Sequence, residues 1–187
     1  SLKADWKPIS WVGNLANSSK ISEDMENKSV SFSQVGTNQS SPSADFYYNG
    51  EKVVGSEWAI SGTINTQTVS GKSGHIYFTV AKDSTNIASF IINRRISGVN
   101  GAYRNIVQDG IRTPSSGNEQ TFSGLTDTAN WTAEFVLICY NGNIALYLKE
   151  PNGEFASAAS YKVDWSSCYA SIMVKQYADV KLSDLSV

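Results

Sequence analysis

The sequence predicts an all-β protein, an antiparallel β-sandwich of the jelly-roll type with about ten strands or more and little helix. Three observations support this prediction. Apolar and polar residues alternate over most of the chain, most clearly through residues 75–95. Asn-Gly pairs at residues 49–50 and 141–142 separate alternating segments, and this pair favours two-residue hairpin turns because both residues tolerate positive φ. No strand–helix–strand unit of the kind that joins parallel strands can be recognised.

The most clearly alternating segment is expected to form two strands joined by a tight turn. In its first strand Ile76, Phe78 and Val80 share one face, and alternation with period two marks a strand with one face in a core. Short polar residues at 83–86 provide turn chemistry, because their side chains bond the neighbouring backbone. The second strand is expected over residues 87–96.

The rest of the chain adds strands around this central hairpin. Residues 1–28 are expected to form an irregular lead-in packed on the sandwich, with a short helical turn at 22–26 capped by Ser22. Residues 109–130 and 151–160 are expected to be loops. Further strands are expected over residues 29–35, 44–49, 56–64, 101–108, 131–140, 143–149, 169–176 and 180–187.

Composition limits the class of protein. The chain has 187 residues, of which 41% are hydrophobic and 17% charged, with a net charge of −2 and a pI of about 5.4. This length suits one domain, residues 1–187, and the acidic balance argues against nucleic-acid binding. No apolar run is long enough to span a membrane. Abundant Ser, Asn, Thr and Tyr suggest a secreted or cell-surface protein, and the absence of a starting Met suggests a module excised from a larger one.

Two cysteines, Cys139 and Cys168, are too few for a disulfide scaffold. They are expected to be buried thiols, and a bridge between them stays an alternative if the chain is exported to an oxidising compartment. Their spacing does not fit a zinc site.

The search for catalytic chemistry gives a mostly negative answer. The one histidine, His75, begins a strand with no nucleophile motif near it. Glycosidases need paired carboxylates, yet Asp45, Glu57 and Glu134 are isolated on their strands. The sequence therefore predicts no enzyme and no required cofactor. Calcium is the one metal considered, since loop oxygens could gather around a hard cation; the candidates are Asn49, Asp83, Asn86, Asp109, Asn118, Asp127 and Asp164.

Several segments resemble concanavalin-A-like and laminin-G-like jelly-roll modules. They are EWAISGTI, HIYFTVAKD, ASFIINRR, EFVLICYNGNIALYLKE and VKLSDLSV. The resemblance covers about residues 29–187 and implies a carbohydrate-binding module of a bacterial secreted or surface glycosidase. Related β-glucanases carry a Glu-x-Asp-x-x-Glu run, which this chain lacks, so their activity is not carried over. Sialic-acid-binding modules of the same superfamily use arginines, for which this chain offers Arg94, Arg95, Arg104 and Arg112.

The expected binding surface is the face of the central strands that points away from the core. Sugars present hydroxyl groups and flat C–H faces, which amides, charged groups and aromatic rings on rigid strands can hold. The candidate glycan-binding residues are Glu57, His75, Tyr77, Asn93, Arg95, Arg104 and Tyr147.

The predicted function is that of a monomeric, non-catalytic module that binds a glycan and targets its parent protein, without binding nucleic acid or inserting into a membrane. Two alternatives stay open: an adhesion or protein-binding sandwich, and a glycoside-processing enzyme with carboxylates on its loops.

Overall fold

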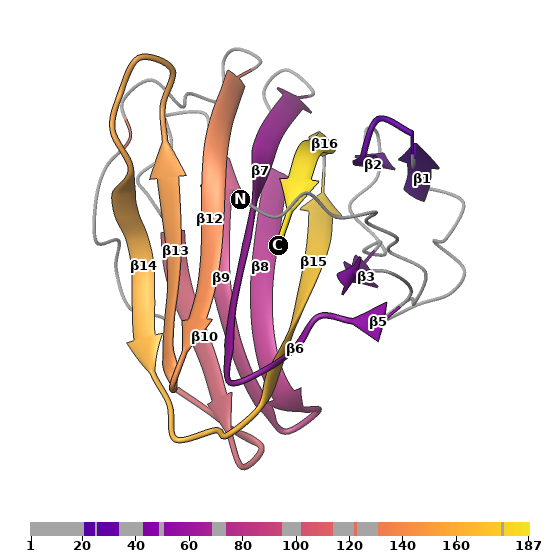
Figure 1. The fold of residues 1–187 in the computed structure, drawn as a ribbon. Helices are drawn as coiled ribbons and strands as arrows, with labels where there is room; N and C mark the ends of the chain where they lie inside the picture. The colour runs from indigo at the N-terminus through magenta and orange to yellow at the C-terminus, as the bar shows by residue number, and fades with distance from the viewer. Residues whose placement is uncertain are drawn as a thin grey trace.

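Two antiparallel β-sheets lie face to face in the computed structural model (Figure 1). The structure describes residues 21–24, 26–33, 43–48, 51–68, 74–94, 102–113, 122, 131–176 and 178–187. These residues form strands and turns with no α-helix, which confirms the predicted all-β sandwich. Among them no helix is long and apolar enough to cross a membrane.

The first sheet has seven strands and is nearer the viewer in Figure 1. In spatial order these are β1 (Ile21–Asp24), β2 (Ser29–Ser33), β16 (Ala178–Ser186), β7 (Glu57–Thr68), β12 (Trp131–Tyr140), β13 (Asn143–Lys149) and β14 (Ala156–Lys162).

The second sheet lies behind the first. In spatial order its strands are β11 (Ile111–Arg112), β10 (Ala102–Gln108), β9 (Asn86–Arg94), β8 (Gly74–Asp83), β15 (Cys168–Gln176) and β3 (Ser43–Asp45), with β6 (Val54–Gly55) also paired to β15. A separate hairpin joins β4 (Tyr47–Tyr48) to β5 (Glu51–Lys52).

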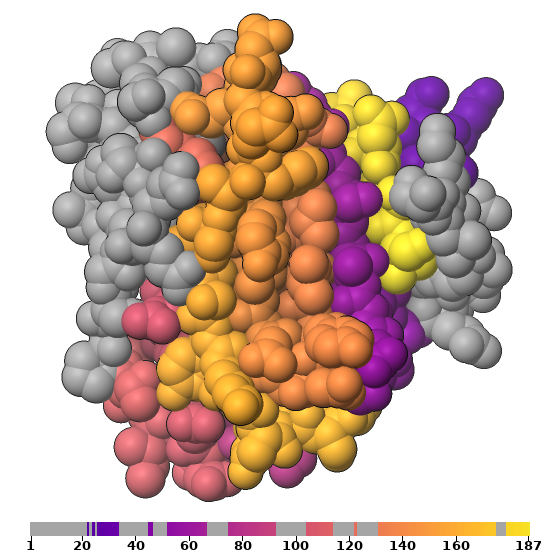
Figure 2. Space-filling model, turned by 60° about the vertical axis from the view of Figure 1, so that its left-hand side comes forward, coloured from indigo at the N-terminus to yellow at the C-terminus, as the bar shows by residue number. Residues whose placement is uncertain are grey.

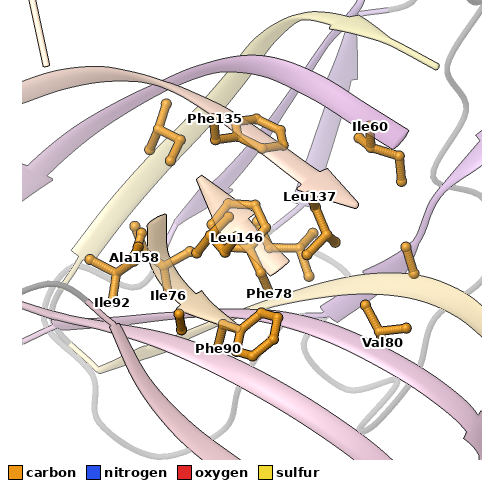
Figure 3. Packing of buried hydrophobic residues seen from close by; sticks show 14 of the residues in the cluster. Ile60, Ile76, Phe78, Val80, Phe90, Ile92, Phe135, Leu137, Leu146 and Ala158 are labelled. Carbon is orange, nitrogen blue, oxygen red and sulfur yellow. The ribbon is translucent and has the colours of Figure 1, made fainter. Parts of the chain in front are cut away.

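The core fills the space between the sheets. Figure 3 shows apolar side chains of both sheets pointing toward one another, and every labelled side chain is 0% exposed. The rings of Phe78 from the second sheet and Phe135 from the first lie 4.9 Å apart between centroids. Burying side chains of this size stabilises the fold by roughly 1.5–3 kcal/mol each. The alternation of the sequence therefore predicts correctly which face of β8 is inside.

Local turn chemistry sets the register of the hairpins. The turn between β12 and β13 has Asn141 and Gly142 at φ 46° and 82°, as predicted for an Asn-Gly pair. The turn between β8 and β9 is held by Asp83, whose Oδ1 accepts hydrogen bonds from the backbone N–H of Thr85 at 2.9 Å and from Asn86 Nδ2 at 3.1 Å. Tyr48 pairs with Glu51 in the hairpin around the other Asn-Gly pair, which itself lies outside the described residues.

Three local predictions are wrong. The segment expected as a helical turn is β1, which pairs with β2 along its whole length. The loop expected at 151–160 contains most of β14, whose small residues show no alternation but pair with β13. The short strand β11 lies inside the expected loop 109–130, of which 114–121 and 123–130 lie outside the described residues, as do residues 1–20 of the lead-in.

Candidate functional site

A row of polar side chains crosses the outer face of the second sheet. The strand registers align them in the order Asn105, Ser89, Thr79, Ser171 and Asp45, one each from β10, β9, β8, β15 and β3. The Thr79 and Ser89 hydroxyl oxygens lie 3.0 Å apart and hydrogen bond to each other. Because neighbouring strands are about 4.8 Å apart, the row is roughly 19 Å long. We call these five residues the polar trough.

Larger side chains flank the polar trough on both sides. Two residues away along the strands, Tyr77, Ile91 and Met173 align on one side. Tyr169 lies on the other side, in line with Ala81 and Ile87. Three residues of the trough are sheltered from solvent, with exposed fractions of 8% for Ser89, 7% for Ser171 and 3% for Asp45.

An ion pair closes the β3 end of the polar trough. Lys52 Nζ lies 2.9 Å from Asp45 Oδ2 and 3.6 Å from the centroid of the Tyr169 ring. Burial raises the pKa of Asp45, although the hydrogen bond and charge of Lys52 oppose the shift. Its other oxygen, Oδ1, is buried and has no hydrogen-bond partner among the described residues. This end of the trough therefore combines a buried acceptor atom with a cation that lies over an aromatic ring.

A second cation lies at the β10 end. Arg112 is exposed, and its Nε donates a hydrogen bond of 3.0 Å to Asn105 Oδ1. Burial raises the pKa of Tyr77, and the nearby charge of Arg112 opposes the shift. The rings of His75 and Tyr77 meet edge to face, with centroids 6.4 Å apart. The trough thus runs between two cationic ends and beside a pair of aromatic rings.

The structure does not gather the predicted site residues on one face. His75 and Tyr77 lie on the outer face of the second sheet, and Asn93 is the register partner of His75, although its side chain lies outside the described ones. Arg95 lies outside the described residues.

Glu57 and Tyr147 are on the outer face of the other sheet, because β7 and β13 belong to it. Alternation along a strand shows which residues share a face but not which sheet the strand joins.

Arg104 corrects the prediction in a different way. It has the same parity as Ile106 and pairs with the buried Phe90, so it lies on the inward face of β10. Its Nη1 donates a hydrogen bond of 3.0 Å to the Ser160 carbonyl oxygen of β14, and its guanidinium lies 6.0 Å from the centroid of the Tyr161 ring. Arg104 therefore ties the two sheets together at one edge.

Most of the polar trough and its flanks could not be recognised from the sequence. Nothing in the sequence distinguishes Ser171, Lys52 or Tyr169, and Asp45 stands out only as a carboxylate isolated on its strand. The one signal in the sequence is that Thr79 and Ser89 alternate with core residues on adjacent strands of a predictable hairpin. The long-range pairing of β15 and β3 with that hairpin leaves no local signal.

The outer face of the first sheet offers a different surface. In Figure 2 the strands β7, β12, β13 and β14 follow one another across this face. A hollow of about 360 Å³ on it is lined in part by Thr63, Glu134, Phe155 and Asp184. Glu134 pairs with Lys149 at 3.1 Å between Oε2 and Nζ, so its charge is balanced locally.

No group of three or more His, Cys, Asp or Glu that could hold a metal ion occurs in the part of the chain that the structure describes. Two of the candidate calcium ligands, Asp83 and Asn86, form a hydrogen bond with each other within their turn. Hydrogen bonds from the Thr85 backbone, and then from the side chains of Asn86 and Thr85, hold the pKa of Asp83 below its usual value. Asn49, Asn118 and Asp127 lie outside the described residues.

Solved structures of lectins and glucanases share this fold. A β-glucanase of Bacillus licheniformis is 10% identical, with 96% of this chain and 89% of that chain covered and a TM-score of 0.55. A lectin from Bauhinia forficata in complex with GalNAc is 12% identical, with 96% and 90% covered and a TM-score of 0.52. The fold is a concanavalin-A-like sandwich. At these identities the likeness establishes the fold alone.

A third solved structure with a similar fold, the Bacteroides ovatus xyloglucan PUL GH43B protein, is 12% identical with a TM-score of 0.57. It covers 99% of this chain but only 36% of that longer chain. No protein-family model and no curated protein sequence matches the chain.

Proposed function

We propose that this protein is a non-catalytic carbohydrate-binding module that holds a glycan along the polar trough. One observation carries the proposal: hydroxyl, amide and carboxylate groups form a continuous row across five strands, with Tyr77 and Tyr169 on either side of it. Support also comes from the lectin described above with bound GalNAc, which has the same fold.

The chemistry of the polar trough suits a saccharide. Ser and Thr hydroxyls can donate and accept hydrogen bonds, as sugar hydroxyls do, while a carboxylate only accepts and an amide does both. Tyrosine rings offer an apolar face to the C–H groups of a pyranose and keep a polar tip in water. All these side chains stand on paired strands, so little freedom is lost when a ligand orders them.

The proposed setting is a module of a larger secreted or surface protein of a bacterium. The low proportion of charged residues, 17%, and the similarity to one part of a longer Bacteroides chain support this setting. In this proposal the module is a monomer, binds no nucleic acid, is not inserted in a membrane and needs no cofactor, and any calcium would be structural. Binding would raise the local concentration of the parent protein on its glycan through linkage.

Screening the protein on a glycan array, followed by calorimetry with the best hit, tests this proposal. Tyr77→Ala should weaken binding by about 2- to 12-fold, the loss expected for one aromatic contact of roughly 0.5–1.5 kcal/mol. Thr79→Val, which removes one hydroxyl from the floor and keeps the shape, should weaken binding by about 5-fold, or roughly 1 kcal/mol.

Tyr147→Ala is the matched control, because Tyr147 is likewise a half-buried tyrosine in mid-strand but lies on the opposite face of the sandwich. It should leave the dissociation constant unchanged. Absence of binding to any glycan at millimolar concentration would refute the proposal. So would a loss of binding in Tyr147→Ala with none in Tyr77→Ala.

A second candidate function rests on Asp45. Burial raises its pKa, and a carboxyl group that keeps its proton at higher pH is what a glycosidase uses as general acid. This carboxyl is the only one on the floor of the polar trough in the described part of the chain, whereas hydrolysis needs a second. Hydrolysis of an array hit that is lost in Asp45→Asn would favour this function over simple binding.

A further inference from the structure

The two cysteines of the chain meet between the sheets. Cys139 lies on β12 of the first sheet and Cys168 begins β15 of the second, 1% and 0% exposed. Both are free thiols in the structure and belong to the same cluster of buried side chains, where each affects the pKa of the other. Two cysteines that are separated in the sequence and belong to different sheets are thus neighbours in the core.

The surrounding bonds hold both cysteines in place. Trp58 Nε1 donates a hydrogen bond of 3.0 Å to the Cys168 carbonyl oxygen, and Cys139 Sγ lies 3.7 Å from the Ser56 carbonyl oxygen, to which it donates. Cys139 also pairs with Trp58 in the β12–β7 ladder. Neither cysteine can easily turn away from the other, because each belongs to a strand that is paired on both sides.

The two thiols influence each other's ionisation, lowering the pKa of Cys139 and raising that of Cys168. The thiolate is the nucleophile in disulfide exchange. Both cysteines are 1% exposed or less in the folded chain, so a dissolved oxidant reaches them only before the two sheets close. Exchange that starts at Cys139 and exchange that starts at Cys168 give the same product.

We propose that Cys139 and Cys168 close a disulfide that joins the two sheets when the chain folds in the presence of a small-molecule disulfide such as oxidised glutathione. When Cys139 reacts first, its thiolate attacks one sulfur of the oxidant and releases one thiolate, leaving a mixed disulfide. Cys168 then loses its proton and attacks the Cys139 sulfur, which releases the second thiolate. Two cysteine thiols are oxidised, one oxidant disulfide is reduced to two thiols, and the two cysteine protons pass to the released thiolates.

The bond has a consequence for the outer face of the second sheet. Cys168 is followed directly by Tyr169, whose ring flanks the polar trough and makes a cation–π contact with the Lys52 ammonium. A covalent link at Cys168 fixes the start of β15 against β12, so it also holds this ring in place. The link closes a loop of about 30 residues, which restricts the unfolded chain substantially.

Refolding the protein with reduced and oxidised glutathione, followed by intact mass measurement and alkylation under denaturing conditions, tests the proposal. The expected product is lighter by two hydrogen atoms, takes up no alkylating reagent and yields a peptide linking Cys139 to Cys168. Its Tm should be about 5–15 °C higher than that of the reduced protein. A Cys139→Ala/Cys168→Ala variant should show no change of Tm with reductant.

Two results would overturn the proposal. The first is a refolded wild-type protein whose two cysteines are both still alkylated after unfolding, or carry only glutathione. The second is a linked product whose Tm equals that of the reduced protein. The mass measurement uses the wild-type chain, so it decides the question even if the alanine variant folds poorly.

Discussion

Replacing Lys52 with methionine gives the sharpest test of the electrostatics at the β3 end of the polar trough. In the wild type its ammonium lies 2.9 Å from the carboxylate of Asp45, whose side chain is 3% exposed while that of Lys52 is 34% exposed. Removing one partner of a fully buried pair costs about 3–5 kcal/mol, because the other charge is left without compensation. Since a third of Lys52 contacts water, we expect a loss smaller than for a fully buried pair, about 2–3 kcal/mol.

The contact of Lys52 with the Tyr169 ring adds to this loss. An ammonium over an aromatic ring at a partly exposed site contributes about 0.5–1 kcal/mol. The total for Lys52→Met at neutral pH is then about 3 kcal/mol, which corresponds to a fall in Tm of about 6–12 °C for a domain of this size. Urea denaturation gives the free energy of unfolding directly, and a thermal melt gives the Tm.

The pH dependence of the same variant shows whether the unpaired charge of Asp45 causes the loss of stability. Burial raises the pKa of Asp45 above its usual 3.8, and removing Lys52 also removes the two influences that oppose this rise. A group whose pKa is raised on folding favours the folded state at low pH and loses that contribution as pH rises through the folded-state pKa. The penalty of Lys52→Met should therefore be larger at pH 7 than at pH 4, and should shrink toward the contribution of the ring contact, about 1 kcal/mol, as Asp45 takes up a proton.

A double variant completes this test. Lys52→Met/Asp45→Asn has no charge at the site, so it should recover about 2 kcal/mol of the loss caused by Lys52→Met alone. Equal penalties at pH 4 and pH 7, or a double variant no more stable than Lys52→Met, would show that the ion pair does not determine stability here.

Three further predictions concern the sandwich itself. Phe78→Ala removes a side chain that is 0% exposed and packs on Phe135, so urea denaturation should show a loss of about 3–5 kcal/mol, and a loss below about 1 kcal/mol would contradict the inter-sheet core. Gly62→Ala would bring a Cβ within 2.9 Å of Leu185 Cδ2 and should cost about 1–3 kcal/mol, whereas an unchanged free energy of unfolding would contradict this packing. Hydrogen bonds from its own turn lower the pKa of Asp83, so its stabilising contribution is present above pH 4 and is lost as pH falls through the lowered pKa. In Asp83→Ala the free energy of unfolding should therefore fall less steeply with decreasing pH below pH 4. The same fall in the variant and the wild type would contradict this role of Asp83.

The hairpins could be predicted from the sequence because their information is local. The expected ends of the 131–140 and 143–149 strands agree with β12 and β13, since alternation and the Asn-Gly turn act within a few residues. The same period identifies Ile76, Phe78 and Val80 as core. β14 was not predicted because its sequence, ASAASYK, has no apolar alternation and gives no indication that it pairs with β13.

The candidate site could be predicted only in part, for a related reason. Tyr77 was correctly placed away from the core, but the strands that complete the polar trough come from distant parts of the chain. β3 and β15 are more than a hundred residues apart in the sequence, yet Asp45 and Ser171 are register partners. Glu57 was assigned to the same surface because nothing in a strand shows which of two sheets it will join.

Mapping amide chemical shifts during a glycan titration tests the central claim most directly. If a saccharide lies along the polar trough, the largest changes should fall on Thr79, Ser89 and Ser171, which share one row on three adjacent strands. Changes confined to β12 and β13 around Tyr147, on the other side of the sandwich, would contradict the account.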